Sequence, residues 1–138
     1  MVIWLVDDSH DHHVVADNTV GRLSGWVLAH FYDGASAVAA YAEVQADPAL
    51  PAPMVVLMDY FIGDERGDQV TRALRALEQR SRAVIIGYSC VASGSARIVE
   101  AGGDLVVRKH CDQSGTNPSL RRYLSSLLSS LPPSTGRS

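Results

Sequence analysis

The chain has 138 residues, of which 46% are hydrophobic and 20% charged, with 15 acidic against 12 basic side chains and a net charge of -3. A chain of this length can bury roughly two-thirds of its unfolded surface, so it is expected to fold as one domain without disulfides or a structural metal. Its longest apolar runs, such as Met1–Val6, are six residues, far short of the roughly 20 that span a bilayer, and a slightly acidic chain without a basic cluster is not expected to bind nucleic acid.

The first residues carry neither a basic region nor a small-residue cleavage site before Asp7 and Asp8. We therefore expect no signal peptide and no membrane segment, and we expect a cytoplasmic location. In that compartment Cys90 and Cys111 are expected to be free thiols.

The first half of the chain predicts two strands, each followed by a helix. Val2–Val6 has no polar residue and is rich in β-branched side chains, as in a strand that is buried on both faces. Apolar residues at helical spacing predict a helix over residues 9–23, and Trp26–Phe31 predicts a second strand. The alanine-rich segment Ala35–Ala46 is a strong helix former, and the prolines of Asp47–Pro53 predict a loop.

The same alternation continues through the middle of the chain. Met54–Met58 predicts a buried strand, and Tyr60–Arg66 is interpreted as a loop that Gly67 ends. Apolar residues at i, i+4 and i+7 predict a helix over Gln69–Arg80. Ala83–Tyr88 predicts the fourth strand.

The last third of the chain completes the pattern. A short helix is predicted over Val91–Ala101, a fifth strand over Leu105–Val107, and an amphipathic helix over residues 118–131. Five strands that alternate with five helices predict an α/β fold, a doubly wound parallel sheet with helices on both faces. We expect one domain over residues 1–131, followed by a flexible tail or the start of a linker over 132–138.

Polar side chains follow the ends of the predicted strands. Asp7 and Asp8 follow the first, Asp59 the third, Ser89 the fourth and Lys109 the fifth. In a parallel sheet these ends meet at one edge, where ligands bind. Crowded carboxylates repel one another, and Mg²⁺ with its preference for oxygen ligands relieves this. A lysine and a hydroxyl group beside the ion are suited to a phosphoryl group, so the sequence predicts phosphoryl chemistry on an aspartate.

Over residues 2–131 the chain resembles the receiver domain of two-component response regulators. The resemblance rests on motifs in the family's order: Leu-Val-Asp7-Asp8-Ser9, Asp33-Gly34, Leu-Met-Asp59-Tyr, Gly67, Ile-Ile-Gly-Tyr-Ser89, and Ala-Gly-Gly-Asp-Leu-Val-Val-Arg-Lys109. It implies a flavodoxin-like fold with strand order 2-1-3-4-5. It also implies that the chain signals by protein–protein contact rather than acting as an ordinary enzyme.

The resemblance assigns a role to each site residue. Asp59 matches the phosphoacceptor, Ser89 the hydroxyl residue that bonds the phosphoryl oxygen, and Lys109 the lysine that pairs with it. Mg²⁺ is implied, with Asp8, more weakly Asp7, Asp59 itself and the backbone carbonyl of Phe61 as its ligands. The implied partners are a sensor histidine kinase or a histidine phosphotransfer protein, and a downstream protein that the sequence does not identify.

Two positions depart from the family pattern. His110 follows the lysine where the family usually has proline, and Val106 stands where it usually has Tyr or Phe. These departures motivate the alternative of a phosphate-independent pseudo-receiver that acts as a binding module.

Three weaker alternatives remain open from the residues. Asp11-His12-His13 spells the short signature of a two-metal phosphoesterase family, whose further motifs are absent. His10, His12 and His13 are close enough to the predicted site to recruit a transition metal, although a solvated helix start is the more ordinary explanation of them. Cys90, His110 and Cys111 follow neighbouring strands, which allows a thiol pair or a metal site.

Overall fold

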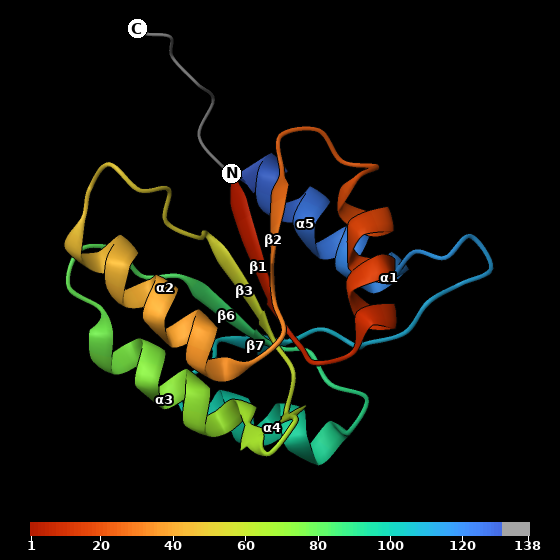
Figure 1. Ribbon diagram of the computed structural model, residues 1–138. Coiled ribbons are helices and arrows are strands. Elements are labelled where there is room, and N and C mark those ends of the chain that lie inside the picture. Colours follow the sequence, from red (N-terminus) through yellow and green to blue (C-terminus); the bar gives the residue numbers. More distant parts are fainter. Residues whose placement is uncertain (131–138) are drawn as a thin grey trace, which may run out of the picture.

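The computed structural model describes residues 1–130 as a five-stranded sheet between two layers of helices, with a small hairpin at one edge (Figure 1). The strands are β1 (Val2–Val6), β2 (Val27–Phe31), β3 (Val55–Met58), β4 (Phe61–Ile62), β5 (Glu65–Arg66), β6 (Val84–Gly87) and β7 (Leu105–Val106). The helices are α1 (His10–Val20), α2 (Gly34–Ala46), α3 (Gly67–Leu77), α4 (Ala92–Glu100) and α5 (Pro118–Ser130).

The order of the main sheet is β2-β1-β3-β6-β7, and all of its strand pairs are parallel. Counted along the main sheet only, this is the predicted order 2-1-3-4-5, and the five predicted helices are also present. The registers align the carboxyl ends of the strands, because Val6 pairs with Met58, Met58 with Gly87, and Gly87 with Val106. Residues that follow these positions therefore emerge at a single edge.

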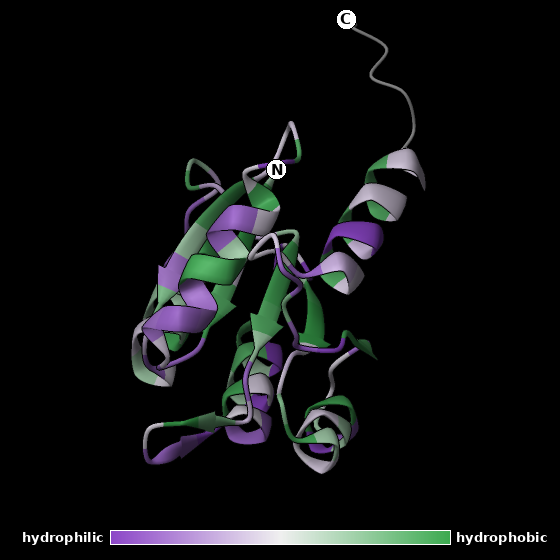
Figure 2. Ribbon diagram, turned by 90° about the vertical axis from the view of Figure 1, so that its right-hand side faces the viewer, coloured by the Kyte–Doolittle hydropathy of each residue, from purple (hydrophilic) through white to green (hydrophobic). Residues whose placement is uncertain are grey.

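Two apolar cores lie on opposite faces of the sheet. One packs α2, α3 and α4 against it and contains Tyr41, Leu74 and Ile98, which are all fully buried. The other packs α1 and α5 against the opposite face and contains Ala16 and Leu120. Figure 2 shows apolar strands in the interior and helices that carry both polar and apolar residues. Burial on both faces explains why the central strands carry no polar residue.

The interpretation of Tyr60–Arg66 as a loop was wrong, because this segment contains the antiparallel hairpin β4–β5. The two strands have two residues each, too few to show an alternating pattern in sequence. Gly63 makes their turn with a positive φ of 61°, a conformation that glycine adopts without steric cost. The hairpin stands directly after Asp59 and therefore shapes the surroundings of that side chain.

Gly67 begins α3 where the chain passes over the backbone of Asp59. Its amide donates a 2.7 Å hydrogen bond to the carbonyl of Tyr60. A Cβ atom at position 67 would overlap the Asp59 carbonyl group. Only glycine fits this close approach, which fixes α3 against the end of β3.

The other differences concern the ends of elements. The first helix ends at Val20 and the third at Leu77, three residues earlier than predicted in each case, as is common for boundaries taken from periodicity alone. The predicted boundary at residue 131 and the tail over 132–138 lie outside the described residues. No helix within residues 1–130 is both long and apolar enough to cross a membrane.

Candidate functional site

The aligned strand ends bring four of the predicted site residues to the carboxyl edge of the sheet. Asp7 follows β1, Asp59 follows β3, Ser89 lies two residues after β6, and Lys109 lies three residues after β7. Lys109 Nζ lies 2.5 Å from Asp7 Oδ2 and 3.3 Å from Asp59 Oδ1. The structure thus joins Asp7, the candidate acceptor Asp59 and the lysine in one charged cluster.

Asp7 is the most buried member of the cluster, with no exposed surface. Its Oδ1 accepts a 2.9 Å hydrogen bond from the amide of Ser9, and its Oδ2 accepts one from Lys109. A buried carboxylate needs such compensation, since an unpaired charge in the interior is costly. Asp7 therefore acts as a fixed negative charge that holds the Lys109 ammonium beside Asp59.

Asp59 is almost as buried as Asp7, with only 7% of its surface exposed. Its Oδ1 accepts a 2.8 Å hydrogen bond from the Tyr60 amide. Burial raises the pKa of the Asp59 carboxyl. The positive charge of Lys109 lowers this pKa, and the negative charge of Asp7 raises it. Asp59 is thus a carboxylate whose negative charge is costly in the free protein and would be relieved by a cation.

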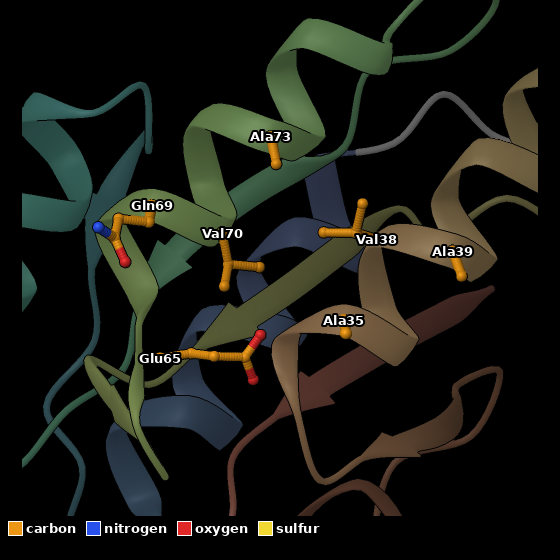
Figure 3. A pocket seen from close by; sticks show the side chains of 7 residues that line it. All are labelled: Ala35, Val38, Ala39, Glu65, Gln69, Val70 and Ala73. Atoms are coloured by element: carbon orange, nitrogen blue, oxygen red, sulfur yellow. The ribbon is translucent and has the colours of Figure 1, made fainter.

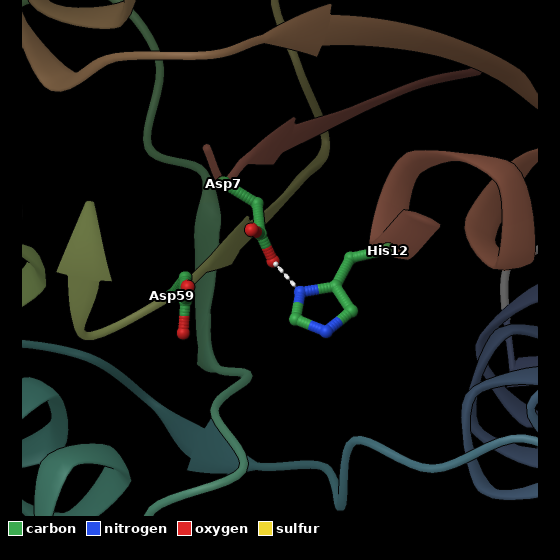
Figure 4. A group of neighbouring side chains, drawn as sticks. All are labelled: Asp7, His12 and Asp59. Carbon is green, nitrogen blue, oxygen red and sulfur yellow. Dashed lines mark hydrogen bonds and ion pairs between the residues drawn. The ribbon is translucent and has the colours of Figure 1, made fainter. Parts of the chain in front are cut away.

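His12 is a member of this cluster that the resemblance did not assign. Its Nδ1 lies 2.9 Å from Asp7 Oδ2 and 3.0 Å from Lys109 Nζ. Figure 4 shows its imidazole reaching from α1 to the carboxylate of Asp7, with Asp59 on the opposite side. In the sequence, the only signal that His12 belongs to this cluster was its position five residues after Asp7, on the first turn of α1.

Asp8 is exposed and lies outside the buried cluster. Its Oδ2 accepts a 2.9 Å hydrogen bond from the amide of Gly63 at the tip of the β4–β5 hairpin. Asp8 therefore fastens the hairpin to the end of β1. Phe61, whose carbonyl was predicted as a further ligand, begins the same hairpin. The metal-binding roles of both residues stay predictions.

Ser89 is buried at the start of the β6–α4 connection, where its Oγ accepts a 3.1 Å hydrogen bond from the Val91 amide. It lines a cavity of about 380 Å³ between this connection, α4 and the end of β7. Lys109 and Val106 line the same cavity, as does Ser95, whose buried hydroxyl has no hydrogen-bond partner among residues 1–130. Ser89 and Lys109 thus have open space beside them.

Phe61 and Val91 are apolar residues two positions beyond Asp59 and Ser89, where the resemblance places the side chains that flank the approach to the acceptor. Phe61 is 56% exposed as a residue, and its ring meets the ring of Tyr60 edge to face, with the ring centres 4.8 Å apart. Val91 is 39% exposed. Neither side chain can hydrogen-bond to a water molecule.

Asn117, which the sequence did not single out, anchors the segment that carries Lys109. Its Nδ2 donates to the Arg108 carbonyl at 2.9 Å and to the Tyr88 hydroxyl at 3.0 Å. Its Oδ1 accepts from the amides of Ser119 and Leu120 at the start of α5. Burial raises the pKa of Tyr88 to about 12, so its hydroxyl stays neutral at physiological pH. One buried amide therefore ties α5 to the residue before Lys109.

The histidines of the Asp11-His12-His13 signature do not act together. His13 is buried, and its Nε2 donates to the Asp7 carbonyl at 2.7 Å while its Nδ1 lies 2.6 Å from Nδ1 of His30. Asp11 is exposed. Within residues 1–130 the acids, histidines and cysteines form a single group able to hold a metal, and it consists of Asp7, His12 and Asp59. Cys90 and Cys111 are free thiols, as predicted, and both are exposed.

A second cavity, of about 390 Å³, lies between α2 and α3 (Figure 3). Small apolar side chains line it, with Val38 and Val70 between the two helices. Glu65 at its edge already accepts a 2.8 Å hydrogen bond from the amide of Gly34. None of the predicted site residues lines this cavity, so it does not belong to the charged cluster.

Comparison with known proteins shows which solved structures share this architecture. No family model matches the chain, and no curated protein matches it. Solved structures do match. A response regulator receiver domain from Methylobacillus flagellatus has a TM-score of 0.71 at 19% identity, over 92% of this chain and 98% of that one. The Mn²⁺-bound form of response regulator Rcp1 has a TM-score of 0.75 at 17% identity, over 96% and 99%.

A third match extends the comparison to eukaryotes. The receiver domain of the histidine kinase CKI1 from Arabidopsis thaliana, as a point mutant, has a TM-score of 0.72 at 17% identity, over 93% of this chain and 89% of that one. The fold is that of response regulator receiver domains. The receiver resemblance and the flavodoxin-like topology predicted from the sequence are thereby confirmed.

Proposed function

We propose that the chain is a response regulator receiver that accepts a phosphoryl group on Asp59 from a histidine kinase or a histidine phosphotransfer protein. The observation that carries this proposal is the position of Asp59 at the end of β3, 3.3 Å from the Lys109 ammonium and beside Asp7. In a receiver fold these are the groups that phosphoryl transfer needs, since its catalysis is mainly positioning and charge neutralisation.

The proposed transfer uses each residue in a defined way. An oxygen of Asp59 attacks the phosphorus of a phosphohistidine, the O–P bond forms, and the N–P bond breaks as the imidazole leaves. The Lys109 ammonium, already beside Asp59, neutralises the charge on the transferred group. The Ser89 hydroxyl, two residues beyond β6, turns from the Val91 amide to donate to a phosphoryl oxygen.

The charges of the site residues fit a divalent cation. Asp7, Asp8 and Asp59 supply three negative charges against the one positive charge of Lys109, which leaves two for an ion to balance. We propose Mg²⁺ held by Asp7, Asp8, Asp59 and the Phe61 carbonyl. When bound, the ion would neutralise the phosphoryl oxygens during transfer.

The proposal is tested with acetyl phosphate and Mg²⁺. We expect the wild type to gain one phosphoryl group by intact-mass analysis and the Asp59→Asn variant to gain none, since an amide oxygen is a poor nucleophile. Asp64→Asn, on the exposed tip of the same hairpin, is the matched control and should be labelled like the wild type. Labelling that survives in Asp59→Asn would disprove the assignment.

We also expect the phosphorylated state to be long-lived. Hydrolysis needs a water molecule in line with the phosphorus, and the exposed side chains of Phe61 and Val91 can neither orient nor activate one. In a Phe61→Asn, Val91→Glu double variant we expect phosphoryl loss to be about tenfold faster than in the wild type, a barrier change of roughly 1.4 kcal/mol. Equal rates would show that these side chains do not control access.

The alternative of a phosphate-independent pseudo-receiver rests on Val106, which is 50% exposed on β7 and provides no aromatic ring to reorient. Beryllofluoride with Mg²⁺, a mimic of the bound phosphoryl group, separates the two functions. A receiver that responds to phosphate should show NMR shift changes around Ser89 and the start of α4, whereas an unchanged spectrum would favour the binding module. The downstream protein and the cytoplasmic location stay predictions.

A further inference from the structure

The cavity of about 380 Å³ at the amino end of α4 carries groups that the proposed phosphoryl transfer does not use. Besides Ser89 and Lys109, its lining includes Ala92 at the start of α4, Val106 of β7, and the polar residues Cys90, Ser95 and Arg108. Small-molecule sites in proteins measure about 300 to 1,000 Å³. The cavity is therefore large enough for a compact organic molecule.

Ser95 brings an unsatisfied hydroxyl group to this lining. The residue is only 1% exposed, and its Oγ has no hydrogen-bond partner among residues 1–130. Its position is fixed by Gly87, because a Cβ atom at position 87 would lie 3.1 Å from the Ser95 Cα atom. Gly87 pairs with Val106, so Ser95 lies over this end of the sheet. A buried hydroxyl without a partner is costly, and a ligand with an oxygen acceptor would satisfy it.

The charged residues of the lining, taken over residues 1–130, are both basic: Arg108 and Lys109. The Lys109 ammonium is already held by Asp7 and Asp59, and it keeps these contacts. Arg108 is exposed, and it takes part in none of the ion pairs within residues 1–130. Its guanidinium is therefore free to pair with an anion, and its planar fork matches the two oxygens of a carboxylate.

The amino end of α4 adds to this attraction for an anion. The amides of a first helical turn have no partner within the helix and carry a partial positive charge. Val91 stands at the N-cap, and its side chain makes no hydrogen bond to these amides. Ala92, the first residue of the helix, lines the cavity. The cavity thus lies where the helix dipole favours negative charge.

We propose that this cavity binds a small organic carboxylate with a compact apolar body, such as an aromatic acid. The Arg108 guanidinium and the Ser95 hydroxyl donate hydrogen bonds to its oxygen atoms. The apolar body packs on Ala92 and on Val106, which is 50% exposed and gains from being covered. The site uses neither Asp59 nor the Lys109 ammonium, so it goes beyond the proposed function and does not depend on it.

The test uses benzoate, with benzamide as a neutral molecule of the same shape. In ¹H–¹⁵N NMR titrations of the wild type, benzoate should shift the amide signals of Ala92, Ser95 and Val106. It should bind at least about tenfold more tightly than benzamide, because only the carboxylate pairs with Arg108. Arg108→Gln should remove this preference. Arg97→Gln, at an exposed position of α4, is the matched control and should keep it.

The two thiols provide a second measurement in the same protein. Cys90 lines the cavity, whereas Cys111 is exposed and does not line it. At a benzoate concentration about ten times its Kd most cavities are occupied, so alkylation of Cys90 by iodoacetamide should slow at least about threefold. Cys111 should react at an unchanged rate.

Three results would each overturn the proposal: equal affinities for benzoate and benzamide, equal losses of affinity in Arg97→Gln and Arg108→Gln, or a Cys90 rate that benzoate leaves unchanged. Asp59→Asn should bind benzoate like the wild type. Loss of binding in that variant would place the anion at the phosphoryl site instead. Labelling of the wild type by acetyl phosphate is measured without benzoate, so the two proposals stand or fall separately.

Discussion

Replacing Lys109 with methionine is expected to destabilise the fold by about 3 kcal/mol, because it leaves two buried carboxylates without their shared counter-charge. Asp7 is fully buried, Asp59 nearly so, and both lie within 3.3 Å of the lysine nitrogen. Methionine retains most of the length and apolar volume of the side chain, so packing changes little. Urea unfolding at pH 7 in the absence of divalent ions measures the loss of stability.

The same variant has an expected pH dependence. Burial and the charge of Asp7 already raise the pKa of Asp59, and removing the ammonium takes away the group that opposes them. The penalty should therefore shrink as the pH falls through this raised pKa, because protonation removes one of the two repelling charges. Adding Asp7→Asn should restore most of the lost stability at pH 7. Independent, additive effects of the two substitutions would contradict the charge cluster.

Replacing Asn117 with alanine is expected to cost about 3 kcal/mol, because several buried groups lose their partners together. Asn117 is fully buried, and its side chain bonds the Arg108 carbonyl, the Tyr88 hydroxyl and two amides of the first turn of α5. Loss of a helix cap alone costs about 1 kcal/mol. The remainder comes from the unpaired carbonyl and hydroxyl groups. Thermal and urea unfolding measure the effect.

The matched control for this substitution is Asn117→Asp. Aspartate keeps the acceptor that caps α5 but cannot donate to the Arg108 carbonyl or the Tyr88 hydroxyl. If the amide acts as described, Asn117→Asp leaves α5 formed but loosens the segment before Lys109, and amide exchange should rise at residues 107–110 more than in α5. Equal protection of that segment in wild type and variant would show that Asn117 is only a helix cap.

The charged cluster was predictable in part because parallel strands align their ends. Each central strand is apolar throughout, and the first polar residues after it, such as Asp7 and Asp59, must emerge at the carboxyl edge. The pairing of Val6 with Met58, and of Met58 with Gly87, shows that the ends are in register. Reading the first one to three residues after each strand was therefore enough to find Asp7, Asp59, Ser89 and Lys109.

The relative placement of Asp7 and Asp8 was not predictable in this way. Neighbouring residues at a strand end point in opposite directions. A strand with both faces buried shows no polar alternation to tell the two directions apart. The resemblance favoured Asp8 as the stronger metal ligand, whereas the structure puts Asp7 in the buried cluster and Asp8 against the amide of Gly63.

The order of the parallel sheet was implied by the resemblance to receiver domains. By itself the sequence determined the alternation of strands and helices and the residues at the carboxyl edge of the sheet. These features follow from local patterns: continuous apolar runs, helical periodicity and glycines at turns. Only the tertiary structure decided that His12 reaches Asp7 and Lys109, that Asn117 anchors the lysine segment, and that residues 61–66 form a hairpin. These contacts depend on how α1, α5 and the long loops pack on the sheet, and the rotation of a helix or the path of a loop leaves no periodic signal along the chain.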